Sequence, residues 1–146
     1  MSLRNLLASL IFASLLCACA GGPVRKVHPS TASIQQLSVL ADGSWKLVLS
    51  IQNFSTFSMH FSALKAKLTI DGKDAGEITI APDLDIVGNS GDVVEAALKT
   101  SLKLPASSEF AYQLKGSIDT SEPNESFKFD TASRLSPVPG VANTYR

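Results

Sequence analysis

Strict alternation of apolar and polar residues limits what this 146-residue chain can fold into. Every second residue is apolar from Trp45 to Ile51, and the pattern returns from Leu64 to Ile70. A period of two is typical of β-strands, whereas an amphipathic helix repeats every 3.6 residues. A strand with one apolar face needs a second layer of structure to cover it. Residues 44–76 therefore predict a packed antiparallel β domain.

Short alternating segments separated by turn signals continue along most of the chain. Asp42-Gly43 and Asp71-Gly72 favour tight hairpin turns, because both residue types tolerate positive φ angles, and Pro105 ends the longest alternating run. No helical window of comparable length is present. The pattern favours an all-β fold, a seven-stranded antiparallel β-sandwich of immunoglobulin or fibronectin type III character, over a barrel. The predicted strands are residues 33–41, 45–52, 64–70, 73–80, 94–104, 110–118 and 127–129.

The N-terminal segment has the pattern of a secretory signal. Arg4 supplies a positive charge, residues 6–16 are an apolar run, and small residues follow. As a helix this run is about 16 Å long, too short to cross a hydrocarbon core of about 30 Å. Leu16-Cys17-Ala18-Cys19 resembles the bacterial lipobox, and the small Ala18 makes Cys19 a better cleavage junction than Cys17.

The lipobox resemblance implies that Cys19 becomes the mature N-terminus and carries two or three acyl chains, enough for stable anchoring. The alternative is a secreted protein with an incidental Cys19. Cys17 would leave with the signal, so no disulfide is expected. By the sorting rule known for lipoproteins, Ala20 at the next position implies the periplasmic face of the outer membrane. We therefore expect a bacterial cell-envelope protein that is attached to the membrane through the lipid at Cys19.

These features divide the chain into four parts. Residues after the lipobox contain Gly and Pro without periodicity, which indicates a tether of up to about 40 Å when extended. Arg25, Lys26 and His28 in it could touch anionic lipid, although simple solvation is the favoured interpretation. The predicted parts are a lipoprotein signal peptide at 1–18, a lipidated Cys and tether at 19–31, the β-sandwich at 32–134 and a flexible C-terminal tail at 135–146.

The charge balance excludes one class of partner. The chain has 13 Lys and Arg against 13 Asp and Glu. Nucleic-acid phosphates require clustered Lys and Arg. We therefore expect no nucleic-acid role.

Three segments resemble the late embryogenesis abundant type 2 family, also called the water-stress and hypersensitive-response domain. They are LVLSIQN ending at Asn53, the LKAKLTIDGKDAGE hairpin with Gly72 and Gly76, and VVEAALKTSLKLP. The family usually follows the Asn with Pro and Asn, where this chain has Phe54 and Ser55. Independently of the family, an Asn at this place can hydrogen-bond the backbone just ahead of it and end the strand.

The resemblance implies a fibronectin-like sandwich that protects non-enzymatically in desiccation, cold or osmotic stress, and bacterial members are often lipoproteins. The family has no catalytic residues, so the resemblance implies none in this chain. We expect a non-enzymatic binding or stress-protective module, with lipid or a client protein as a further partner. Two alternatives stay open: a lipid-carrying domain with an apolar groove between its sheets, and a structural adaptor of an envelope complex.

Little in the sequence indicates catalysis or metal binding. His28 and His60 are the only histidines, too few for a zinc site, and no Gly-x-Ser-x-Gly motif exposes a serine. We interpret His60, between Met59 and Phe61, as an ordinary loop residue rather than a catalytic base. Asp83, Asp85 and Asp92 could bind calcium but lack the spacing of a calcium loop, which favours a solvated turn. We expect no catalytic residue, metal or cofactor.

One apolar cluster interrupts the alternation. Phe54, Phe57, Met59 and Phe61 are interleaved with Ser, Thr and His. If all four face inward they close one end of the sandwich, which is the favoured interpretation. If two or more stay exposed they form an apolar patch suited to lipid, membrane or client protein.

Overall fold

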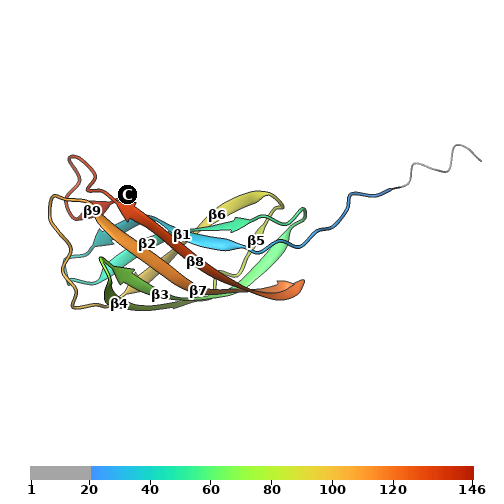
Figure 1. The fold of residues 1–146 in the computed structure, drawn as a ribbon, viewed down its shortest axis with the longest axis horizontal. Helices are drawn as coiled ribbons and strands as arrows, with labels where there is room; N and C mark the ends of the chain where they lie inside the picture. The colour runs from blue at the N-terminus through green and yellow to red at the C-terminus, as the bar shows by residue number, and fades with distance from the viewer. Residues whose placement is uncertain (1–20) are drawn as a thin grey trace, which may run out of the picture.

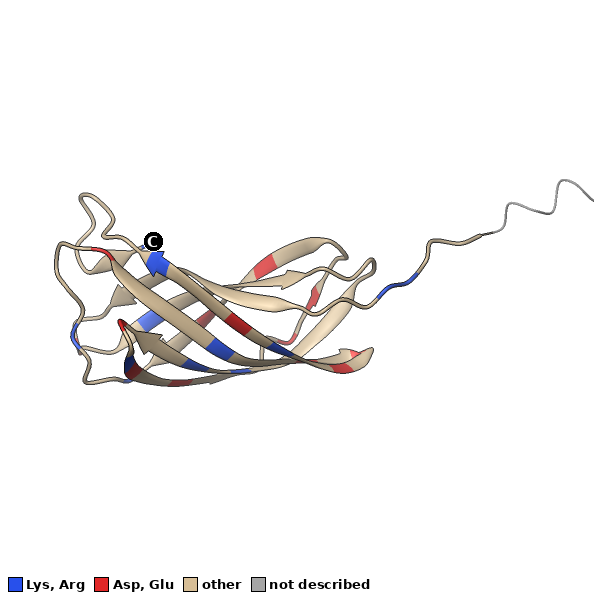
Figure 2. Ribbon diagram, viewed as in Figure 1, with Lys and Arg blue, Asp and Glu red and all other residues tan. Residues whose placement is uncertain are grey.

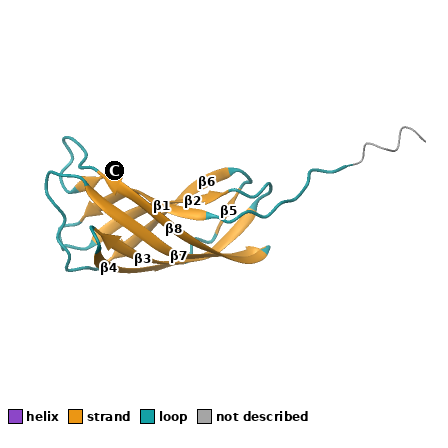
Figure 3. Cartoon of the chain, in the orientation of Figure 1, coloured by secondary structure: helices purple, strands orange, loops and turns teal. Residues whose placement is uncertain are grey.

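The computed structural model describes residues 21–146, so the predicted signal peptide and Cys19 lie outside the described residues. All regular structure within this range is β-strand (Figure 3). The strands are β1 (Thr31–Val39), β2 (Trp45–Asn53), β3 (Met59–Ile70), β4 (Lys73–Ile80), β5 (Leu84–Ile86), β6 (Ser90–Leu98), β7 (Phe110–Glu122), β8 (Asn124–Leu135) and β9 (Thr144–Tyr145).

The strands form two antiparallel sheets that pack face to face (Figure 1). One sheet has the order β6-β2-β1-β9, and the other has the order β4-β3-β7-β8, with β5 pairing a second part of β3. The predicted all-β sandwich is confirmed. The predicted count of seven strands is wrong, because β5 has only three residues and β9 only two, too few for alternation to be seen in the sequence.

The alternating residues of the central strands fill the space between the sheets. The core includes Trp45 and Leu49 of β2, Leu64 of β3 and Phe110 of β7, and each of these side chains is at most 1% exposed. Asp71 and Gly72 join β3 to β4 as a two-residue turn in which both have positive φ, 46° and 78°. The predicted alternation and hairpin therefore place the core residues correctly.

Strand β1 is bonded to the opposite sheet along its outer edge. The backbone N–H of Ile34 donates to the Tyr112 hydroxyl at 3.1 Å, and the Thr131 hydroxyl donates to the carbonyl of Ala32 at 2.7 Å. Burial raises the pKa of Tyr112, which keeps this hydroxyl neutral. Backbone groups that would be open at an edge strand are thus satisfied by side chains.

Several predicted strand boundaries are wrong, among them those of β8, which spans 124–135 rather than 127–129, and two of the errors follow from how the strands pair. Strand β3 begins at Met59 rather than at Leu64, because β5 pairs with its first residues. Strand β6 ends at Leu98 rather than at Leu104. Its partner β2 begins at Trp45, which pairs with Leu98, so no backbone is left for later residues to pair with.

The C-terminal segment is folded, and the prediction of a flexible tail at 135–146 is wrong. Its strand β9 pairs with Leu37 and Ser38 of β1. Tyr145 is 3% exposed, its hydroxyl donates to the carbonyl of Pro105 at 3.0 Å, and its ring packs edge-on against Phe110 at 5.1 Å between centroids. The prolines and glycine before it shape a loop that returns the chain to the sheet.

Candidate functional site

The aromatic segment lies at the end of the sandwich where the N-terminal segment enters (Figure 1). We call this the tether end. It consists of residues 24–30, the β2–β3 connection with the start of β3 at 53–61, the segment 81–89 that contains β5, and the tip of the β7–β8 hairpin at 121–125. It is the part of residues 21–146 where most of the predicted site residues come together.

Asn53 holds the loops of the tether end together. Its side chain is 1% exposed, and its amide Nδ2 donates to the carbonyls of Phe57 at 3.0 Å and Ile86 at 2.9 Å. Its Oδ1 accepts a hydrogen bond from the backbone N–H of Ser55 at 2.9 Å. The predicted bond to the backbone ahead is confirmed, and the bonds to Phe57 and Ile86 join two connections that are distant in sequence.

The four residues Phe54, Phe57, Met59 and Phe61 do not form the exposed apolar patch that was the alternative to an inward arrangement. Met59 and Phe61 are 1% and 0% exposed, because both face inward from the first residues of β3. Phe57 is half-buried, and the guanidinium of Arg25 lies over its ring at 4.2 Å from the centroid. Phe54 alone of the four is exposed, at 49%. The favoured inward arrangement holds for Met59 and Phe61.

Part of the predicted tether is bound to the sandwich. Thr56 exchanges hydrogen bonds with Lys26 at 2.9 and 3.0 Å, and its hydroxyl also donates to the carbonyl of Val24 at 2.8 Å. The backbone of His28 bonds the Ser55 hydroxyl through both its N–H and its carbonyl. Only residues before Val24 can therefore act as a free tether, so the predicted span of 19–31 is too long.

His60 lies between two carboxylates. Its Nδ1 is 2.9 Å from Asp85 Oδ1, and its Nε2 is 3.2 Å from Asp83 Oδ1. The hydrogen bond to Asp85, followed by the attraction of both carboxylates, raises the pKa of His60 above its usual value. Through its contact with Asp85, the ring joins β3 to the edge strand β5. His60 is thus part of an ion-pair cluster, which its sequence context did not indicate.

This cluster does not form a metal site within residues 21–146. Each ring nitrogen of His60 is occupied by a different carboxylate, so the three groups do not converge on one point. Asp92 lies on β6, where its carboxylate accepts a hydrogen bond from the backbone N–H of Val93. Asp83, Asp85 and Asp92 therefore do not come together as ligands of one metal ion.

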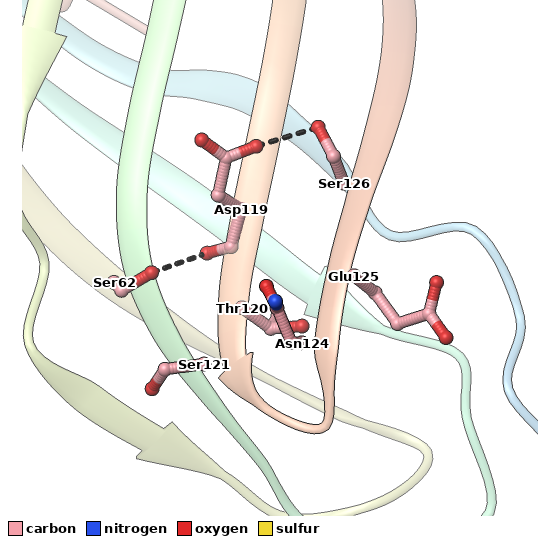
Figure 4. A pocket seen from close by; sticks show the side chains of 7 residues that line it. All are labelled: Ser62, Asp119, Thr120, Ser121, Asn124, Glu125 and Ser126. Atoms are coloured by element: carbon pink, nitrogen blue, oxygen red, sulfur yellow. Dashed lines mark hydrogen bonds between the residues drawn. The ribbon is translucent and has the colours of Figure 1, made fainter.

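A shallow polar hollow lies beside the tether end, along the β7–β8 hairpin (Figure 4). Ser126 donates to the Asp119 carboxylate at 2.6 Å, and Ser62 donates to the Asp119 backbone carbonyl at 3.2 Å. The Thr120 hydroxyl donates to the carbonyl of Pro123 at 2.6 Å. The hydroxyls of Ser62, Thr120 and Ser126 are thus already hydrogen-bonded within the protein. The hollow is lined by Ser62, Asp119, Thr120, Ser121, Asn124, Glu125 and Ser126.

Charge at the tether end is mixed. Acidic residues occupy the hairpin tip and the approach to β5, whereas Arg25 and Lys26 lie on the entering segment (Figure 2). The acidic residues are Asp83, Asp85, Glu122 and Glu125. No helix long and apolar enough to cross a membrane occurs in the part of the chain that the structure describes.

Comparisons with known proteins find similarity in fold. No family model and no curated protein matches the sequence. The X-ray structure of a Northeast Structural Genomics Consortium target is similar with a TM-score of 0.50 at 13% identity, over 80% of this chain and 92% of that chain.

Two further solved structures are similar to a lesser degree. The solution structure of a protein described as late embryogenesis abundant has a TM-score of 0.49 at 14% identity, over 92% of this chain and 84% of that chain. A crystal structure of a protein from Archaeoglobus fulgidus has a TM-score of 0.42 at 11% identity, over 77% of this chain and 98% of that chain. At such identities, the likeness concerns the fold alone.

Proposed function

We propose that this chain is a lipid-anchored β-sandwich of the bacterial cell envelope, held on the periplasmic face of the outer membrane, that acts as a non-enzymatic binding or stress-protective module. The observation that carries the proposal is the lipobox-like sequence ending at Cys19, followed directly by a folded sandwich. The resemblance of the strand ending at Asn53 and of the hairpin at Gly72 to the late embryogenesis abundant type 2 family supports the protective role.

The packing of the sandwich fits a module that acts through its surface. Trp45, Phe61 and Phe110 are at most 1% exposed and fill the space between the sheets. A lipid-carrying domain would need an apolar groove in that space. The large open hollows of residues 21–146 lie on the outside and are lined mainly by polar or charged residues, so no observation favours the lipid-carrying alternative.

Metabolic labelling with palmitate tests the anchor. We expect the full-length chain to incorporate palmitate and to fractionate with the outer membrane. The Cys19→Ala variant should lose the label, whereas the matched Cys17→Ala variant should keep it, because only Cys19 follows a small residue. Absence of label in the wild type, or label that survives Cys19→Ala, would contradict the proposed anchor.

Survival of a deletion strain tests the protective role. We expect the strain without this chain to survive drying and osmotic shock less well than the wild type, and the full-length chain to restore survival. Restoration by Cys19→Ala should be weaker, because the unanchored chain is not held at the membrane. Equal survival and envelope integrity of deletion and wild-type strains would count against a stress role.

A further inference from the structure

Exposed apolar side chains are concentrated at the tether end. Phe54 is 49% exposed and Val87 is 65% exposed, in two neighbouring connections. The large exposed hydrophobic residues of the described range are Val24, Val27, Phe54 and Val87 at the tether end, Val93 on β6, and Leu40 and Val141 near the opposite end. Grouped exposed apolar side chains mark contact surfaces more often than single ones do.

The two connections that carry Phe54 and Val87 are bonded to each other. The backbone N–H of Asn89 donates to the carbonyl of Ser55 at 2.9 Å, in addition to the bonds made by the Asn53 side chain. A Cβ atom at Gly88 would lie 2.5 Å from the backbone nitrogen of Phe57, so the two chains touch along their backbones. Phe54 and Val87 are therefore held outward on one firm platform rather than on separate mobile loops.

The length of free chain keeps this platform close to any anchor at Cys19. Val24 is already hydrogen-bonded to Thr56, so only five residue steps separate the sandwich from Cys19. Five extended residues span at most about 18 Å, less than half of the 40 Å that the sequence alone suggested. The headgroup region on each side of a bilayer is several ångströms thick. The tether end must then lie at or near the membrane surface.

From these observations we propose that the tether end docks on the bilayer, with Phe54 and Val87 inserted among the lipid headgroups and the sandwich standing end-on. This inference rests on the proposed lipid anchor at Cys19. Because the anchor holds the platform at a high local concentration of lipid, weak insertion is enough to set the orientation. Acidic and basic side chains are mixed at this end, because Arg25 and Lys26 lie beside Asp83, Asp85 and Glu122, so the proposed contact depends on the apolar residues rather than on anionic lipid.

Depth-dependent fluorescence quenching tests this orientation. The mature chain keeps no free thiol once Cys19 is acylated, so a single new cysteine can carry an environment-sensitive nitrobenzoxadiazole label. Lipidated full-length variants Phe54→Cys and Val87→Cys would be reconstituted into phosphatidylcholine vesicles that contain nitroxide-labelled lipid. Leu40→Cys and Val141→Cys are matched controls, because both residues are exposed near the opposite end. The buried Trp45 reports whether each variant is folded.

We expect quenching at positions 54 and 87 to be at least threefold stronger than at 40 and 141, with emission shifted to shorter wavelength. Raising the salt concentration should leave the difference unchanged. Equal quenching at both ends, in chains that still float with the vesicles, would overturn the inference and leave the anchor intact. Emission from the label at position 54 that stays at the wavelength of a water-exposed label would also overturn it. Chains that do not float would overturn the anchor and the inference together.

Discussion

Replacing Asn53 with alanine should destabilise the sandwich strongly. The side chain makes three well-formed hydrogen bonds of 2.9 to 3.0 Å, to the backbone of Ser55, Phe57 and Ile86. Each such bond contributes about 1 kcal/mol net, and a buried partner left without water raises the cost, so we expect a loss of about 3–4 kcal/mol. With an m-value of about 1.5–2 kcal/mol/M, the urea midpoint should fall by about 2 M.

Urea unfolding followed by tryptophan fluorescence measures this loss, because the chain has one tryptophan and Trp45 is buried. Cys19→Ala serves as the background, since it lacks the proposed lipid. Asn53→Asp should be at least as destabilising as Asn53→Ala, because it places a carboxylate oxygen against the carbonyls of Phe57 and Ile86. Asn124 is exposed, so Asn124→Ala should change stability by less than about 0.5 kcal/mol. A midpoint shift below about 0.5 M for Asn53→Ala would refute this reasoning.

Three further predictions follow from the packing and the ion pairs. Gly116→Ala should cost about 3 kcal/mol, because its Cβ would lie 1.9 Å from the carbonyl oxygen of Lys65, whereas Gly22→Ala meets open space and should be neutral in the same urea assay. The raised pKa of His60 means that its contribution to stability is fully present below about pH 6.5 and is lost as pH rises through the raised value. His60→Gln should remove that pH dependence, seen by comparing urea midpoints at acidic and alkaline pH; an unchanged profile would refute the assignment. Tyr145→Ala should cost about 3 kcal/mol in thermal unfolding, because the ring is buried against Phe110, and an unchanged stability would refute this packing.

Alternation along the central strands was enough to predict the sandwich and much of its core. The apolar positions of 45–51 and 64–70 face inward as expected, because a strand's side chains alternate whatever its partners are. The start of β3 could not be predicted from the alternation. Met59 and Phe61 face inward at every second position, but the register shifts between Phe61 and Ala63, so the next inward residue is Leu64 rather than Ala63. A bulge depends on the neighbouring strand, which a single sequence does not display.

The tether end could be predicted only in part. The bond from Asn53 to Ser55 is local and follows from residue type, but its bonds to Ile86 depend on a connection more than thirty residues away. The same holds for Tyr145, whose hydrogen-bond partner Pro105 is forty residues away in sequence. The proline and glycine residues near the C-terminus therefore indicated a flexible tail, whereas the segment is folded. His60 and Asp85 are likewise brought together only when β5 pairs with β3.

The cross-sheet bonds of β1 close part of its outer side, next to the short stretch that pairs with β9. Ile34 and Ala32 direct their outward backbone groups to Tyr112 and Thr131 of the opposite sheet. In native-state hydrogen exchange, the amide proton of Ile34 should therefore exchange as slowly as those of central strands. Another chain that approached this edge would find the Ile34 donor already engaged, which lowers the tendency of the edge to begin intermolecular pairing.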